Sequence, residues 1–259
     1  MKKFIEFLKE EEQEPVDVSG WKRVGDQLGS NPGGRFQNKA GNHYYVKFSK
    51  SDNHARNEFL AHHLYKQAGA PVMDHYLVKH PKGLGTATQW QDVQPFDENN
   101  EGHIKDIKKH FATHCLAANW DAIGLVNDNQ VVTKKGMATV DVGGSLLYRA
   151  QGGPKGEAFG HKCDEWDTLR KYNKSTFGRM TPEEMIDSTR HMASNLRPHH
   201  IVQLTHLHGP GDHSEKVELA AKLINRRKDL IQKANALADK HGLTPVEEPH
   251  EDHTPPEKP

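Results

Sequence analysis

The chain of 259 residues has few cysteines, no long apolar run and no net formal charge. Its two cysteines, Cys115 and Cys163, cannot build a disulfide framework, so a reducing cytoplasm is the expected compartment. No apolar run approaches the roughly 20 residues that span a bilayer, and we expect no membrane partner. The 35 basic and 35 acidic residues cancel, which argues against a dedicated nucleic-acid binder, because such proteins are usually basic.

The order of predicted elements divides the chain into a β-rich half with one helix and a mostly helical half. Turn residues between short apolar segments predict strands at 21–28, 34–37, 43–48, 74–79 and 85–91, with a small strand pair within 129–141. Periodicity and capping residues predict helices at about 49–69, 103–118, 164–172, 181–195, 197–207 and 213–241. We therefore expect an α+β fold with an N-terminal arm (1–19), a first lobe (20–94), a second lobe (95–242) and a disordered tail (243–259).

Three features of the first half would suit a phosphate site. A glycine-rich stretch between two predicted strands contains Gly29, Ser30, Gly33 and Gly34. Glycine allows backbone N–H groups to approach phosphates, although plain hairpin loops have the same composition. Lys47 lies on a predicted strand, and Glu58 lies eleven residues later in the following helix. Protein kinases use such a pair to contact phosphates; a solvated lysine and a glutamate on a wet helix face are the alternative.

Carboxylates and asparagines follow in the second half. Asp121 ends an apolar helix within Asn119-Trp120-Asp121, and Asp141 ends a predicted strand two residues before Gly143. Phosphoryl transfer needs one carboxylate at the acceptor hydroxyl, and an asparagine with a second carboxylate to hold Mg²⁺. Each residue alone could be a cap or a turn residue. Their joint order after the glycine-rich stretch, Lys47 and Glu58 favours a kinase-like site.

Over roughly residues 21–241 these motifs resemble the atypical kinase-like fold shared by protein kinases, phosphatidylinositol kinases, actin-fragmin kinase and HipA-type toxin kinases. Asn119-Trp120-Asp121 stands in place of His-Arg-Asp, and Asp141-Val142-Gly143 in place of Asp-Phe-Gly. The resemblance implies a two-lobed, ATP-dependent phosphotransferase that uses Mg²⁺ or Mn²⁺ and acts on Ser or Thr of a protein substrate. A catalytically weak pseudokinase or interaction module, and a small-molecule or lipid kinase, are the alternatives.

The resemblance also implies roles for single residues at the nucleotide. The backbone of Gly29, Ser30, Gly33 and Gly34 would cover the phosphates. Lys47 would contact them and would be oriented by Glu58. The segment that joins the two halves would meet adenine through backbone groups of Gln89, Trp90 and Gln91.

Catalytic and metal-binding roles are implied for the second half. Asp121 would position the acceptor hydroxyl, with Lys47 as the second catalytic residue. Asn129 and Asp141 would bind the metal ion. The asparagine of these families usually follows the aspartate by five residues, and that position is Val126 here. Asn127 is therefore the alternative to Asn129, which we prefer because it directly precedes a predicted strand.

Two further groups of residues have an open interpretation. The basic side chains of Arg149, Lys155 and Lys162 could meet an anionic substrate, or could lie in a solvated loop. Five histidines are crowded at positions 199, 200, 206, 208 and 213. A zinc site there is disfavoured, because the spacing of His206 and His208 does not place them on one helical face and no cysteine is near.

Overall fold

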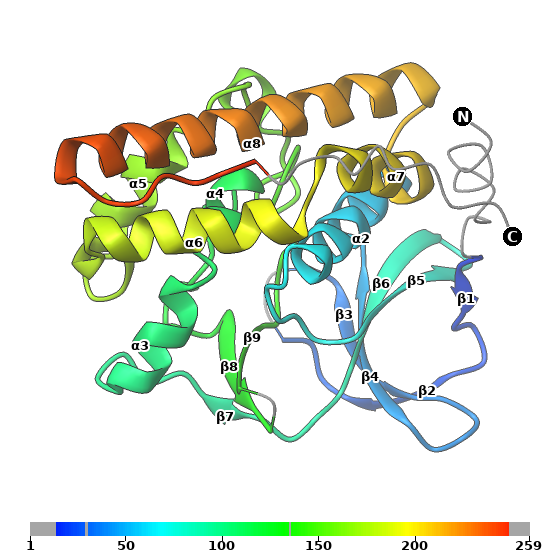
Figure 1. Cartoon of the computed structure of the whole chain (residues 1–259). Helices are drawn as coiled ribbons and strands as arrows, with labels where there is room; N and C mark the ends of the chain where they lie inside the picture. Colours follow the sequence, from blue (N-terminus) through cyan, green and yellow to red (C-terminus); the bar gives the residue numbers. More distant parts are fainter. Residues whose placement is uncertain (1–13, 29–30, 135, 249–259) are drawn as a thin grey trace, which may run out of the picture.

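The computed structural model of the chain describes residues 14–28, 31–134 and 136–248. It has two lobes, one built on a curled sheet with a single helix and one mostly helical (Figure 1). The predicted two-lobed α+β organisation is confirmed. Among the described residues, no helix combines the length and the apolar character that crossing a membrane requires.

The first lobe is a six-stranded sheet with the strand order β1-β5-β6-β4-β3-β2. Its strands are β1 (Val16–Asp17), β2 (Lys22–Gly25), β3 (Gly33–Gln37), β4 (His43–Phe48), β5 (His75–His80) and β6 (Gly83–Gln89). Strand β1 pairs in parallel with β5, and the other neighbours are antiparallel. Strand β4 lies between β3 and β6, and backbone hydrogen bonds to both neighbours fix the position of each β4 residue.

Helix α2 (Asp52–Gln67) joins the sheet to the helical lobe. It begins at Ser51, whose hydroxyl accepts the N–H of His54 as an N-cap. One side packs on β5 and β6 through Phe59 and Leu77, and the other packs on α7 (Pro198–His208). Figure 1 shows α2 between the sheet and α7. The helix is buried on both sides, so its rotation about its own axis is fixed.

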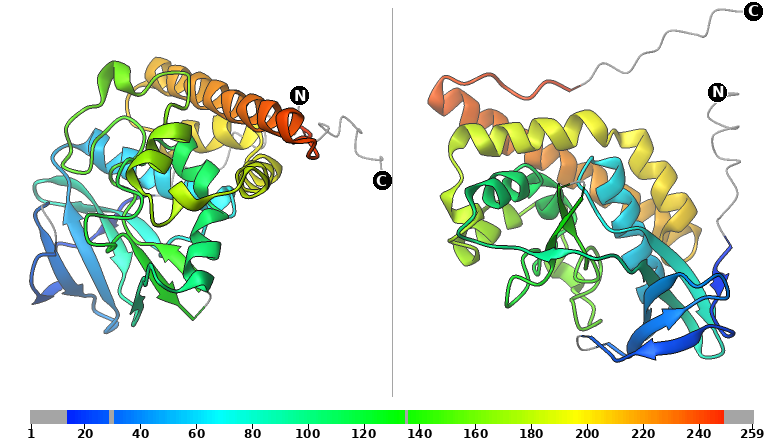
Figure 2. Two further views of the ribbon diagram at one scale, coloured as in Figure 1. Left: turned by 90° about the vertical axis from the view of Figure 1, so that its left-hand side faces the viewer. Right: turned by 90° about the horizontal axis from the view of Figure 1, so that it is seen from below.

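The second lobe surrounds the largest core of the described residues. Its helices are α3 (Glu101–Lys108), α4 (Phe111–Leu116), α5 (Glu165–Tyr172), α6 (Pro182–Asn195), α7 and α8 (His213–His241), with short turns of 3₁₀ helix at Gly156–Ala158 and Phe177–Arg179. Helix α8 runs along α6 and α7 (Figure 2). A three-stranded sheet of β7 (Gln94–Pro95), β8 (Gln130–Thr133) and β9 (Gly136–Thr139) lies beside α3.

The structure differs from the predicted elements in three places. The helix predicted at 103–118 is two helices, because the hydroxyl of Ser188 bonds the carbonyl of Lys109 and the N–H of Ala112 at the break. Strands β1 and β7 have two residues each and were not predicted. We expected disorder from residue 243, but Val246 is buried and bonds Asn235 of α8. The rest of the predicted tail lies outside the described residues.

Candidate active site

A cavity of about 590 Å³ is lined by residues of both lobes and of the segment between them. Tyr45, Lys47, Thr88 and Gln89 come from the sheet, Gln27 and Leu28 from the chain after β2, Trp90 and Gln91 from the joining segment, and Asp128, Asn129 and Asp141 from the second lobe. Met73, Val93 and Val140 add apolar side chains, which pack on the buried Val131 and Ala138. The cavity thus has an apolar wall beside the joining segment and a charged wall around Lys47 and Asp141.

The charged wall is centred on Lys47. Its Nζ lies 3.2 Å from Oε1 of Glu58 and 2.7 Å from Oδ2 of Asp141. The side chain of Glu58 is 3% exposed and also accepts the hydroxyl of Thr86 at 3.2 Å. Lys47 pairs with Gly33 on one side and Thr86 on the other, which fixes its place in the sheet. One strand, one helix and one loop therefore meet at a single ammonium group.

The electrostatics of this group favour the charged forms of Lys47 and Asp141. Burial acts to lower the pKa of Lys47, but Asp141 and Glu58 outweigh it and raise the pKa above its ordinary value. Burial acts to raise the pKa of Asp141, but Lys47 and the N–H of Gly143 hold it below the ordinary value. The Gly143 N–H donates to Oδ1 of Asp141 at 2.8 Å. A cation and a carboxylate of fixed position thus face the cavity.

A series of buried hydrogen bonds holds the backbone of Asp121 in place. The amide oxygen of Asn119 accepts the N–H of Asp121 at 3.2 Å, and the amide nitrogen of Asn119 donates to Tyr65 at 3.1 Å. The Tyr65 hydroxyl in turn bonds His114 at 2.8 Å. Burial raises the pKa of Asp121, Asn129 opposes the rise, and Asp141 and Asp128 add to it. These bonds give a physical reason for the Asn-X-Asp spacing.

The structure separates the two asparagines considered for a metal ion. Asn129 lines the cavity together with Asp141, and its Nδ2 donates to the carbonyl of Asp121 at 2.5 Å. Asn127 is not among the lining residues and has a left-handed backbone with φ of 63°. Asp128, which the sequence did not single out, lines the cavity as well.

Gly33 and Gly34 lie in a strand and not in the expected loop. Gly33 and Gly34 are buried in β3, opposite Lys47 and Val46 of β4. A Cβ at Gly33 would lie 2.4 Å from the carbonyl oxygen of Val46, so the residue must be glycine for the strands to approach. Gly29 and Ser30 lie outside the described residues.

Lys155 was expected in a solvated or substrate-binding loop, and this prediction is wrong. It is 4% exposed, and its Nζ donates to the carbonyls of Ala118 at 2.6 Å and Gly144 at 2.7 Å. Its third side faces the Trp120 ring, 4.8 Å from the centroid. Ala118 has a left-handed backbone with φ of 47°, which costs about 1–3 kcal/mol in a residue other than glycine. Lys155 thus holds the Asp121 loop against the chain that follows Gly143.

Replacing Lys155 with Met is expected to change how stability depends on pH. Burial lowers the pKa of Lys155 from 10.5 to about 7. Between these values the unfolded chain binds more protons than the native one, so this group makes the free energy of unfolding rise with pH. Urea unfolding should show the wild type gaining about 2 kcal/mol over Lys155→Met between pH 7 and pH 9. The exposed Lys162→Met is the control; equal pH dependence of wild type and Lys155→Met would contradict the prediction.

The crowded histidines do not form a metal site. Within the residues that the structure describes, no group of three histidine, cysteine or acidic side chains could hold a metal ion. The ring centres of His63 and His208 instead lie 4.1 Å apart, with the rings tilted by 53°, beside Phe59, and burial lowers the pKa of His63 to about 2. His75 lies 3.6 Å from Glu58, and burial lowers its pKa to about 3, so it is neutral and leaves Lys47 as the cation of Glu58.

A solved structure of a known protein shares this architecture. The Helicobacter pylori proinflammatory kinase CtkA matches 88% of this chain and 99% of its own length, with a TM-score of 0.63 and 12% sequence identity. An aminoglycoside phosphotransferase from Alicyclobacillus acidocaldarius matches 87% of this chain and 93% of its own, with a TM-score of 0.36 and 11% identity. A chain of the Shewanella oneidensis HipA, HipB and operator DNA complex matches 94% and 73%, with a TM-score of 0.41 and 11% identity. No family model and no curated protein matches the sequence.

The chain therefore has a two-lobed kinase-like fold, as the sequence motifs predicted. At 12% identity the likeness to CtkA concerns the fold alone. The roles of the residues in the cavity depend on the geometry described above.

Proposed function

We propose that the chain is an ATP-dependent kinase that transfers the γ-phosphoryl group to Ser or Thr of a protein. The observation that carries this proposal is the position of Lys47, which bridges Glu58 at 3.2 Å and Asp141 at 2.7 Å on the wall of the cavity. A purely structural ion pair would not need a third partner from another lobe at the edge of a 590 Å³ cavity. The kinase-like fold supports the same reading.

The two walls of the cavity suit the two ends of ATP. A flat base can lie on Met73, Val93 and Val140, with its edge toward the backbone of Gln89, Trp90 and Gln91. The α- and β-phosphates would then reach Lys47, whose cationic form is stabilised by its two carboxylates. Gly29 and Ser30, which we expect over the phosphates, lie outside the described residues, so their role stays a prediction.

The donor atoms near Lys47 fit a hard divalent cation. Asp141 offers a carboxylate, and Asn129 offers the Oδ1 of an amide whose Nδ2 is occupied by the Asp121 carbonyl. Oxygen donors of this kind are what Mg²⁺ and Mn²⁺ prefer. When bound, such an ion would neutralise charge on the phosphates. Asp141 also keeps Lys47 in place, so it would orient the cation that meets the phosphates.

Asp121 is the residue that we assign to the acceptor hydroxyl. It is half-buried, its backbone is held by Asn119, and its raised pKa makes it a better base than an ordinary aspartate. It would orient the hydroxyl and accept its proton while the oxygen attacks the γ-phosphorus and the bond to the ADP oxygen breaks. Little covalent work is asked of the protein, because positioning and electrostatics provide most of the rate.

Transfer of label from [γ-³²P]ATP in the presence of Mg²⁺ tests the proposal. Wild type should label itself or a mixed protein substrate, and Asp121→Ala should reduce labelling by roughly 10²- to 10⁴-fold. Asp141→Ala should also abolish the Mg²⁺-dependent rise in melting temperature that ATP causes. Asp239→Ala, an exposed aspartate of α8, is the matched control. Absence of both labelling and ATP-induced stabilisation in the wild type would refute the proposal, whereas stabilisation without labelling would indicate a pseudokinase.

A further inference from the structure

A second cavity, of about 420 Å³, is lined by Trp120, the residue before Asp121. Asp128 and Asn129 of the same loop line the larger cavity. The loop that carries Asp121 therefore contributes residues to both cavities. If the larger cavity holds ATP, the smaller one is lined by the direct neighbour of the residue that we assign to the acceptor hydroxyl.

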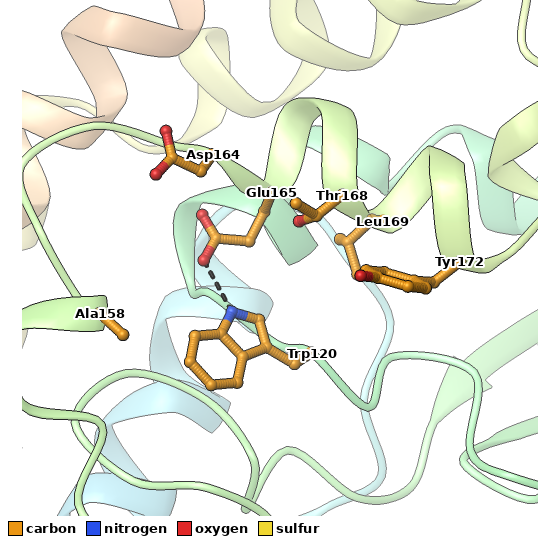
Figure 3. A pocket seen from close by; sticks show the side chains of 7 residues that line it. All are labelled: Trp120, Ala158, Asp164, Glu165, Thr168, Leu169 and Tyr172. Carbon is orange, nitrogen blue, oxygen red and sulfur yellow. Dashed lines mark hydrogen bonds between the residues drawn. The ribbon is translucent and has the colours of Figure 1, made fainter.

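The indole of Trp120 is held as a rigid wall of this smaller cavity. Its Nε1 donates to Glu165 at 2.8 Å, the dashed line in Figure 3, and Glu165 is held by the buried Arg226 at 2.6 Å. Lys155 and Arg149 lie 4.8 Å and 5.2 Å from the centre of the ring. Four polar side chains thus surround one aromatic residue that remains 38% exposed. Such preorganisation is expected of a binding surface rather than of an idle surface tryptophan.

Most of the residues that line the smaller cavity present apolar groups, and the charged side chains in its lining are those of Asp164 and Glu165. Ala158, Thr168, Leu169 and Tyr172 face Trp120 across the cavity (Figure 3). The carboxylate of Glu165 is occupied by Trp120 and Arg226, and that of Asp164 points away from both rings in Figure 3. Because the guanidinium of Arg149 already lies against the Trp120 ring, a second cation would be repelled. The occupant that fits is an uncharged apolar group.

The rim of the smaller cavity is open, which favours a chain that passes over it. Tyr172 is 76% exposed, so one wall would leave a small molecule in water, whereas small-molecule sites enclose most of their ligand. Leu125 and Val126, four and five residues after Asp121, are 99% and 78% exposed. The Asp121 loop thus exposes apolar side chains of its own, as a polypeptide lying across the loop would require.

We propose that this smaller cavity binds a large apolar side chain of a polypeptide acceptor, close in sequence to the Ser or Thr that meets Asp121. The proposal rests on the kinase function proposed above and adds a substrate preference to it. Trp120 and Tyr172 form the two aromatic walls, and Leu169 forms the base between them. The bond that forms in the reaction remains that between the acceptor oxygen and the γ-phosphorus, with the proton passing to Asp121 and ADP leaving.

The test uses the full chain, [γ-³²P]ATP and a set of synthetic peptides with one Ser acceptor. At each position within four residues of the Ser, the peptides carry Leu, Ser, Lys or Glu. Labelling at low peptide concentration reports kcat/KM, and release of ADP is followed in parallel. At one position Leu should be preferred over Ser by about tenfold or more, since burial of a side chain in an apolar pocket discriminates on this scale.

Two variants alter the cavity from opposite directions. Thr168→Trp fills it and Tyr172→Ala removes a wall; both positions are exposed, so the fold should tolerate the changes. Both should reduce the Leu-to-Ser ratio toward one. Val217→Ala, at an exposed apolar residue of α8, is the control and should keep the ratio. The ratio is internal to each variant, so a loss of folded protein does not imitate the effect.

The outcomes separate the two proposals. Equal kcat/KM for all peptides, or a Leu preference that both variants keep, would overturn the proposal that the smaller cavity binds the acceptor. The kinase function would remain intact. Release of ADP without labelling of any peptide would also overturn it, since a polypeptide is then not the acceptor. Absence of both ADP release and ATP binding would refute the kinase function, and the acceptor proposal would fall with it.

Discussion

Lys47→Met is expected to abolish phosphoryl transfer and to destabilise the fold at the same time. The activity should fall by roughly 10²- to 10³-fold, because a preorganised charge at the phosphates is lost. The free energy of unfolding should fall by about 3 kcal/mol, because Glu58 remains buried without its cation. The other contacts of Glu58 are the hydroxyl of Thr86 at 3.2 Å and the neutral ring of His75 at 3.6 Å, which cannot replace an ammonium group.

A second substitution distinguishes the two effects. Glu58→Gln in the Lys47→Met background removes the buried charge and keeps an oxygen that can accept the Thr86 hydroxyl. We expect the double variant to regain most of the lost stability and none of the lost activity. Glu58→Gln alone should reduce activity less than Lys47→Met, because Asp141 still holds Lys47 at 2.7 Å.

Urea unfolding and labelling from [γ-³²P]ATP measure the four proteins side by side. Lys22→Met is the control, since Lys22 is an exposed lysine on strand β2 of the same sheet. Recovery of activity in the double variant would show that Lys47 does not act on the phosphates. Unchanged stability of Lys47→Met would show that the buried pair does not hold Glu58 as described.

The sequence predicted the strand of Lys47 and the helix of Glu58 because both elements have local and periodic signals. Strand β4 runs from His43 to Phe48 as expected, and α2 has an N-cap, a strong first turn and apolar positions that fix its buried sides. With both elements placed, the eleven-residue spacing brings Lys47 opposite Glu58. The contact between Lys47 and Glu58 therefore follows from the local sequence patterns of β4 and α2 and from the short connection between them at residues 49–51.

The parts that the sequence could not show depend on partners far along the chain. The break between α3 and α4 exists because Ser188 satisfies the backbone groups of Lys109 and Ala112, 79 and 76 residues away. Strands β1 and β7 are too short to have a periodicity and are defined by the strands they join. Lys155 has the local sequence of a surface loop. Its burial depends on the carbonyls of Ala118 and Gly144, which no local pattern indicates.

Arg226 is a further residue whose role no local pattern indicates. Among the substitutions considered, its replacement should lower the free energy of unfolding the most. Arg226 is 0% exposed, and its guanidinium donates to the carbonyls of Cys115, Leu116, Gly160 and Lys162 and to the carboxylate of Glu165. These five bonds use all five N–H groups that an arginine has. One side chain of α8 thus ties the end of α4 to the chain that leads into α5.

Arg226→Met is expected to lower the free energy of unfolding by about 3–5 kcal/mol, because four carbonyls lose its N–H donors and the 3% exposed Glu165 loses its cation. Arg226→Lys should recover little of this, since three donors on one atom cannot reach five acceptors arranged around a plane. Lys228→Met, an exposed cation on the same helix, should change stability by less than about 0.5 kcal/mol. Urea unfolding of the three variants checks these values.

The same substitution should also reduce activity by more than the loss of folded protein explains. Cys115 and Leu116 lie just before the Asp121 loop, and Glu165 holds the indole of Trp120. Without Arg226 these groups lose their common anchor, and Asp121 loses part of its support. Labelling from [γ-³²P]ATP at a temperature where Arg226→Met is fully folded should therefore be well below wild type. Wild-type activity under that condition would limit Arg226 to stability and would remove it from the support of the Asp121 loop.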